Sequence, residues 1–215
     1  MRTVPMLLTL FACASGAGCS HAMRITNLGE YDPPPAPRSA ERYRAGVTSA
    51  TLVDPGTRRY VEAVVDAMRR SGDYEPIVFP YAPSSGEDVD LVIDIAVTSR
   101  YSGRGTNFLV SWPGFLIFAP ALFGYGYRAE IDTQVSVTRL AGGGVTAIAV
   151  PARYDFRQAE LDRTWTEIGW LEVGIIPLVG GFVFTSYDPD LTPEFVAKVS
   201  PSYGRYVAAK IREAL

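Results

Sequence analysis

The fold of this chain follows first from Val89-Asp90-Leu91-Val92-Ile93-Asp94-Ile95-Ala96-Val97-Thr98. Apolar side chains occupy the odd-numbered positions and the acids stand between them, which predicts a strand with one buried and one solvated face. Residues 127–139 repeat this alternation. The turn Gly142-Gly143-Gly144 then leads into residues 145–156, so these two segments form a predicted hairpin. Because each strand has one polar face, we expect a mostly antiparallel sheet that helices cover on one face.

Helical periodicity lies outside these strands. Residues 57–71 carry one apolar stripe, with Thr57 as the expected N-cap and Gly72 as the C-terminal stop. The other predicted elements are strands over 43–53 and 76–81, a helix over 158–170, and helices that begin at Thr192 and at Ser200. Together these elements predict a single α+β domain over residues 42–215.

Two uncharged inserts, 105–127 and 173–187, interrupt this pattern. The first is long enough to cross a bilayer, but two internal prolines argue against one straight helix. Three alternatives are open for it: packing in the core of the domain, an exposed loop that docks on a membrane or a partner, or a membrane span. The side chains that would make membrane or partner contact are Trp112, Phe115, Phe118 and Phe123.

The N-terminus has the pattern of an export leader. Arg2 precedes the apolar residues 4–12, and the small residues 15–18 stand directly before Cys19. A charged start, a short apolar core and a small-residue cleavage site are typical of a signal peptide, and this core is too short for a membrane span. With a cysteine just past the cleavage point, the segment resembles the signal peptides of bacterial lipoproteins.

That resemblance implies that Cys19 is the lipidated residue. Gly16 stands where the lipoprotein pattern usually has leucine, and Cys13, which has a leucine at that spacing, is the alternative. An ordinary secretory signal that is cut near Ala17 or Ala22 is a further alternative.

The chain then divides into a signal peptide over 1–18, a lipidated cysteine and tether over 19–41, and a periplasmic domain over 42–215. The tether contains Asp32-Pro33-Pro34-Pro35-Ala36-Pro37, so it should be extended, and at ~3 Å per residue it could reach roughly 60 Å, although no sequence feature forces full extension. In the lipoproteins that the leader resembles, a non-acidic residue after the lipidated cysteine, here Ser20, directs the protein to the outer membrane. We therefore expect an outer-membrane protein that faces the periplasm.

Composition narrows the chemistry of the domain. The chain has 20 Lys and Arg against 23 Asp and Glu, so it lacks the basic character that nucleic-acid binding requires. Both cysteines lie in the leader region, which excludes a disulfide, a thiolate metal site and cysteine catalysis from the domain. The single histidine, His21, lies in the expected tether. We therefore predict no catalytic residues, no metal ligands and no cofactor.

The acidic residues are assigned structural roles. Asp90 and Asp94 share one solvated strand face, and Asp188-Pro189-Asp190 is typical of a turn rather than of a calcium loop. A hydrolase that uses only Asp and Glu would need two carboxylates that face each other across a cleft. That hydrolase is a third functional hypothesis.

The order of the predicted elements on a lipid tether resembles the small α/β periplasmic domains of envelope lipoproteins. The curli-secretion lipoproteins and the lipoprotein activators of cell-wall synthases are examples. From the leader, the tether and the lack of a nucleophile–base set, we expect a non-enzymatic outer-membrane lipoprotein whose periplasmic domain binds a cell-envelope partner. The alternative is a membrane-active or translocation component that uses the inserts 105–127 and 173–187. The expected partners are the membrane, through the lipid anchor, and an envelope protein, without nucleic acid.

Overall fold

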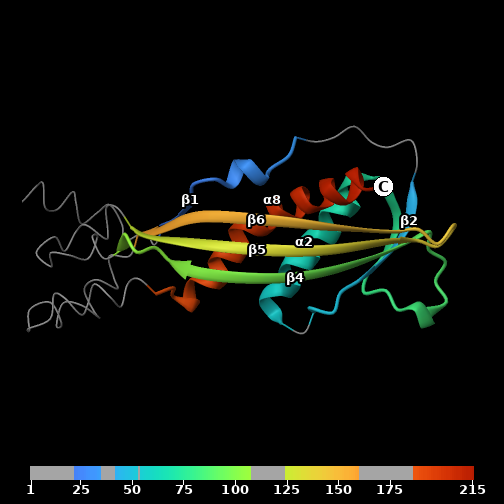
Figure 1. Cartoon of the computed structure of the whole chain (residues 1–215), viewed down its shortest axis with the longest axis horizontal. Helices are drawn as coiled ribbons and strands as arrows, with labels where there is room; N and C mark the ends of the chain where they lie inside the picture. Colours follow the sequence, from blue (N-terminus) through green and yellow to red (C-terminus); the bar gives the residue numbers. More distant parts are fainter. Residues whose placement is uncertain (1–21, 35–41, 53, 108–123, 160–185) are drawn as a thin grey trace, which may run out of the picture. The chain divides into compact units, whose positions relative to one another are not determined.

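The computed structural model of the chain describes residues 22–34, 42–52, 54–107, 124–159 and 186–215 (Figure 1). These residues form an α+β fold, as the sequence predicted, in which six strands make one sheet in the order β1-β6-β5-β4-β2-β3. The elements in chain order are β1 (Ala22–Ile25), η1 (Leu28–Tyr31), β2 (Tyr43–Thr48), α2 (Pro55–Ser71), β3 (Tyr74–Val78), η2 (Pro83–Ser85), β4 (Leu91–Gly103), β5 (Tyr125–Arg139), β6 (Val145–Ala159), η4 (Pro189–Leu191) and α8 (Thr192–Glu213).

The sheet is mostly antiparallel. β2 lies parallel to both of its neighbours, β3 and β4. β4 and β5 run in opposite directions, because the Leu140 N–H donates to the Asp90 carbonyl near one end and the Arg104 N–H donates to the Gly126 carbonyl near the other. β5 then returns into β6 through the glycine turn, which confirms the predicted hairpin.

The chain divides into two compact units. The root unit contains both ends of the first uncharged insert and the last residues of the second, and its described residues are 22–24, 102–107, 124–127, 156–159 and 186–187. The helical unit contains α2 and α8, and it comprises residues 25–101, 128–155 and 188–215. The long strands β4, β5 and β6 contribute residues to both units.

In the helical unit, α2 and α8 cover one face of the sheet (Figure 1). The buried side chains of β4 stand at alternate positions, Leu91, Ile93, Ile95 and Val97. On the same face, the Tyr101 hydroxyl hydrogen-bonds to the Tyr60 hydroxyl of α2 at 3.1 Å, and the Tyr101 ring packs on Phe195 of α8 with centroids 5.7 Å apart. Thr133 of β5 shares a buried hydrogen bond with Tyr203 of α8. The alternation in the sequence therefore identified the helix-covered face correctly.

The two helices approach each other closely at Gly204 of α8. A Cβ at this position would lie 2.3 Å from the Ala63 carbonyl oxygen of α2, so a larger residue would push the helices apart. This contact depends on the tertiary packing and leaves no mark in the periodicity of either helix.

The start of α2 differs from the prediction. Asp54 is the N-cap, and its carboxylate accepts a hydrogen bond of 2.8 Å from the Thr57 N–H, while Pro55 takes the first helical position. The prediction of Thr57 as the N-cap is therefore wrong, since Thr57 lies inside the first turn. The predicted C-terminal stop is confirmed, because Gly72 takes a left-handed conformation with φ 76°.

The C-terminal region is one helix, so the prediction of a second helix start at Ser200 is wrong. α8 continues through Pro201 to Glu213. The Ser200 hydroxyl donates to the Val196 carbonyl at 2.6 Å, and the Ser202 hydroxyl donates to the Val199 carbonyl at 3.0 Å, so side chains bond helix carbonyls on both sides of the proline. The helix continues because its apolar stripe stays buried against the sheet on both sides of the proline.

Several strand boundaries also differ from those predicted. β2 ends at Thr48 rather than at residue 53, because the Ser49 hydroxyl accepts a hydrogen bond from the Thr51 N–H and turns the chain. β6 extends to Ala159, so the helix predicted over 158–170 is wrong at its first two residues; the rest of that range lies outside the described residues.

Part of the predicted tether is folded. β1 adds to β6, and η1 then packs on α8. The Tyr31 ring contacts the Tyr154 and Tyr206 rings with centroids 4.7 and 5.1 Å apart, and Asp32 pairs with Arg205 at 2.7 Å. The expectation of a continuous extended tether with a reach of roughly 60 Å is therefore wrong. The proline content of the segment did not reveal these contacts, because they need β6 and α8 as partners.

Candidate functional site

The contact and lipidation residues predicted from the sequence, Cys19, Trp112, Phe115, Phe118 and Phe123, all lie outside the described residues. The structure does describe the roots of the inserts, by which we mean both ends of the first insert and the C-terminal end, Ser186 and Tyr187, of the second. These roots form the candidate functional site.

Hydrogen bonds around Gly126 clamp the start of the first insert to its end. The Asn107 side chain is 1% exposed; its Oδ1 accepts from the Gly126 N–H at 2.7 Å, and its Nδ2 donates to the Gly126 carbonyl at 2.9 Å. The Arg104 N–H donates to the same carbonyl at 2.9 Å. A Cβ at Gly126 would lie 3.0 Å from Arg104 Cδ, so the lack of a side chain admits this close approach. The clamp fixes the two ends of the first insert beside each other.

An aromatic cluster joins the roots of both inserts. Tyr127 ends the first insert and Tyr187 ends the second, and their ring centroids are 5.6 Å apart. Phe156 of β6 contacts both, at 5.4 Å from Tyr127 and 6.4 Å from Tyr187. The two inserts are far apart in the sequence, yet their roots meet in one cluster.

β1 brings the N-terminal side of the chain to the same unit. The Thr26 N–H donates to the Asp155 carbonyl, and the Asn27 side chain donates to the Arg153 carbonyl, so partner numbers fall as chain numbers rise. β1 is therefore antiparallel to β6, and Ala22 lies toward the end of β6 from which the chain continues to the second insert.

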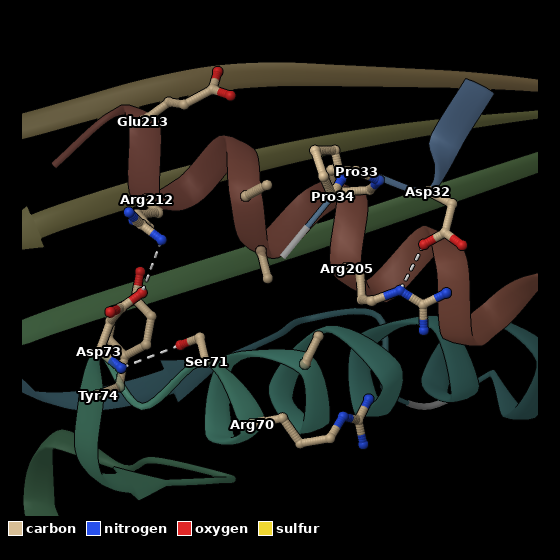
Figure 2. A pocket seen from close by; sticks show the side chains of 13 residues that line it. Asp32, Pro33, Pro34, Arg70, Ser71, Asp73, Tyr74, Arg205, Arg212 and Glu213 are labelled. Atoms are coloured by element: carbon tan, nitrogen blue, oxygen red, sulfur yellow. Dashed lines mark hydrogen bonds and ion pairs between the residues drawn. The ribbon is translucent and has the colours of Figure 1, made fainter. Parts of the chain in front are cut away.

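Figure 2 shows a separate groove of about 900 Å³ in the helical unit. Its lining comes from the C-terminal parts of α2 and α8, the start of β3 and residues 32–34. Asp73 is 2% exposed and lies 3.6 Å from Arg212. The Tyr74 hydroxyl is buried, and it makes no hydrogen bond within the part of the chain that the structure describes.

Two groups of this groove have shifted pKa values. Burial raises the pKa of Tyr74, and the charge of Asp73 raises it further, so the phenol stays protonated at neutral pH. At the other side of the groove, the hydrogen bond from Arg205 lowers the pKa of Asp32, which stays ionised. The groove therefore offers a buried hydroxyl donor and two carboxylate–guanidinium pairs to a bound group.

The acids considered in the sequence have structural partners. Asp90 accepts from Arg44 Nη2 at 2.6 Å, Asp94 accepts from the Thr48 hydroxyl at 2.7 Å, and Asp188 caps the Asp190 N–H at 3.0 Å. Across residues 22–34, 42–52, 54–107, 124–159 and 186–215, no group of three or more His, Cys, Asp or Glu residues could hold a metal ion. Among the helices in those ranges, none combines the length and the apolar character that a membrane span needs.

Sequence reasoning did not identify Asn107, Tyr187 or the pair Asp73 and Tyr74. A lone asparagine before an apolar stretch carries no spacing signal, and Tyr187 was counted as part of the second insert. Their roles depend on which strands become neighbours, so a sequence pattern could not have assigned them.

No protein-family model and no curated protein matches this chain. Among solved structures, the chain is similar to the PelC dodecamer from Paraburkholderia phytofirmans, with 10% identity over 86% of this chain and 98% of that one, at a TM-score of 0.30. A single-substitution variant of the same dodecamer matches with 12% identity over 85% of this chain and 98% of that one, at a TM-score of 0.28. Likeness at this level assigns neither a family nor an activity.

Proposed function

We propose that this chain is a non-enzymatic outer-membrane lipoprotein, anchored through Cys19 and facing the periplasm, whose folded part binds a cell-envelope partner. The leader over 1–18, the cysteine after it and the non-acidic Ser20 support the anchor and its destination.

One observation carries the proposal: the sheet begins almost directly after Cys19. β1 starts at Ala22, three positions later, and three extended residues span at most about 11 Å. Residues 22–24 belong to the root unit, which also holds the roots of both inserts. A lipid on Cys19 would therefore keep the root unit close to the bilayer surface.

This short spacing also favours the second candidate function, a membrane-active or translocation component. The inserts 105–127 and 173–187 leave the unit that the anchor would hold near the lipid. Trp112, Phe115, Phe118 and Phe123 are then the side chains that we propose for membrane or partner contact, because aromatic residues favour the interface between headgroups and acyl chains.

The anchor is tested by Cys19→Ala in the full chain, expressed with its own leader in a bacterium with two membranes. We expect the variant to move from the membrane fraction to the soluble periplasmic fraction and to lose incorporation of radiolabelled palmitate. The reason is that each acyl chain contributes about 0.8 kcal/mol per buried CH₂, so several chains should dominate over contacts of single side chains with the bilayer surface.

Cys13→Ala is the matched control, and we expect it to remain acylated and membrane-bound. Release of Cys13→Ala from the membrane, with retention of Cys19→Ala, would show that Cys13 and not Cys19 is the lipidated residue. Retention of both variants in the membrane would contradict lipid anchoring and would make the inserts the anchor.

Phe115→Asp distinguishes a membrane-contact role of the first insert, which the second candidate function requires, from a core-packing role. In a membrane-contact role, the charge abolishes binding of the Cys19→Ala form to phosphatidylglycerol-containing vesicles while the melting temperature stays unchanged. In a core-packing role, the buried charge costs a large part of a typical stability of roughly 5–15 kcal/mol and unfolds the domain. Vesicle sedimentation and thermal unfolding of the same samples separate these outcomes.

A further inference from the structure

The two edges of the sheet differ in how they are protected. At one edge, β3 is short and carries Glu75 and Pro76, residue types that discourage further strand pairing. At the other edge, β1 has four residues while its neighbour β6 has fifteen. Within the part of the chain that the structure describes, β1 therefore leaves most of the outer edge of β6 without a strand partner.

Residues 22–31 hydrogen-bond to the outer edge of β6 only as far as Arg153 within the described chain. The Arg153 N–H donates to the Tyr31 hydroxyl at 3.0 Å, and the Asn27 side chain donates to the Arg153 carbonyl at 2.8 Å. Because backbone groups of alternate residues point to the same side of a strand, the N–H and C=O groups of Val145, Ala147 and Ala149 also point away from β5. No described residue hydrogen-bonds to them on that side.

The free edge is also uncharged. Residues 141–152 contain no Asp, Glu, Lys or Arg. The two large apolar side chains that are most exposed in the described chain, Leu140 at 54% and Val145 at 64%, lie at this hairpin. Sheet edges in natural proteins are normally protected by charge, so a long uncharged edge is a template for another strand.

We propose that β6 pairs through this edge with β6 of a second copy of the chain, antiparallel about a two-fold axis at Ala147. In this register Val145 of one copy faces Ala149 of the other, and Ala147 faces itself, which gives about six N–H···O=C bonds. No charged residue faces another along residues 145–149, so self-pairing meets no electrostatic penalty.

Pro151 lies outside the pairing in this register. It lacks an N–H, and an axis at Ala147 places it opposite Gly143, which lies in the turn before β6 begins. An axis at Ile148 would also give about six bonds, but it would place Pro151 opposite Val145 inside the ladder and leave the Val145 carbonyl of each copy without a donor. The proposal does not depend on the lipid anchor, because the edge residues lie outside the leader.

Cysteine crosslinking of the full chain in the bacterial envelope tests the register. Paired strand residues have Cα atoms about 5.5 Å apart, a distance that a disulfide spans. We expect mild oxidation to convert Ala147→Cys into a covalent dimer at least tenfold more than Val145→Cys or Ala149→Cys alone, while the double variant V145C/A149C restores the dimer. The unsubstituted chain controls for Cys19, and the same set in the Cys19→Ala background tests independence from the anchor.

Ultracentrifugation of the purified full chain tests the pairing itself. Ala147→Pro removes an outward N–H and should convert dimer to monomer without loss of secondary structure, whereas Ala147→Thr keeps that N–H and should remain dimeric. A monomeric unsubstituted chain, a dimer that survives Ala147→Pro, or an Ala147→Cys adduct with the mass of a different protein would each overturn the proposal.

Discussion

Different interactions stabilise the interior of the helical unit and the interior of the root unit. In the helical unit, alternate apolar side chains of the sheet pack under two amphipathic helices, and the contacts repeat along each element. In the root unit, one buried amide and a few aromatic rings join segments that are distant in the sequence. A buried ring of the helical unit contacts several elements, whereas the buried amide of the root unit holds one local clamp, so loss of the ring should destabilise more of the fold than loss of the amide.

The largest effect is expected in the helical unit for Phe195→Ala. The ring is fully buried between Tyr101 and Tyr154, with centroids 5.7 and 5.9 Å away. Its removal leaves a cavity and should lower the free energy of unfolding by about 3–5 kcal/mol in urea titration. Lys198→Ala, at an exposed position of the same helix, is the control and should change stability by less than about 0.5 kcal/mol. A loss of under about 1 kcal/mol for Phe195→Ala would contradict the prediction that packing of α8 on the sheet stabilises the helical unit.

An intermediate and local effect is expected in the root unit for Asn107→Ala. The substitution removes the acceptor of the buried Gly126 N–H, and an unsatisfied buried group costs about 1–3 kcal/mol. Amide hydrogen exchange should show faster exchange at Gly126 and little change at Ile95 in the helix-covered sheet. Equal loss of protection in both units would contradict the division drawn here.

The smallest effect is expected for Asp90→Asn at the surface of the helical unit. Hydrogen bonds from the Arg44 side chain and N–H lower the pKa of Asp90 from 3.8 to about 2. A carboxyl with a lowered folded-state pKa stabilises the fold above pH 4, and that contribution is lost as the pH falls from about 4 through about 2. Urea midpoints measured between pH 2 and 6 should depend less on pH in Asp90→Asn and in Arg44→Gln. Full additivity of the two substitutions in a double variant would show that the pair does not interact.

The strands and helices of the helical unit were predictable because their patterns are local. The alternation from Val89 to Thr98 indicates one buried face. Gly72 ends α2 because glycine, unlike residues with a side chain, takes φ 76° without strain. The boundaries were less predictable, since Asp54 rather than Thr57 caps α2 and the apolar stripe carries α8 through Pro201. In both cases a local signal competed with packing, and packing decided.

The folding of residues 22–34 could not be predicted from composition. Its prolines and small residues are typical of a tether, but Tyr31 and Asn27 bond to β6, and Asp32 bonds to α8. A segment of this kind orders only because a strand edge with unpaired backbone groups lies beside it.

The sequence by itself determined the alternation of the strands and the position of the two uncharged inserts, and it predicted an export leader, because each of these is a pattern among neighbouring residues. Only the tertiary structure decided that Tyr127 and Tyr187 meet, that Asn107 closes on Gly126, and that Thr26 bonds to Asp155. These contacts join residues from 19 to 129 positions apart, and strand order, not local propensity, brings them together.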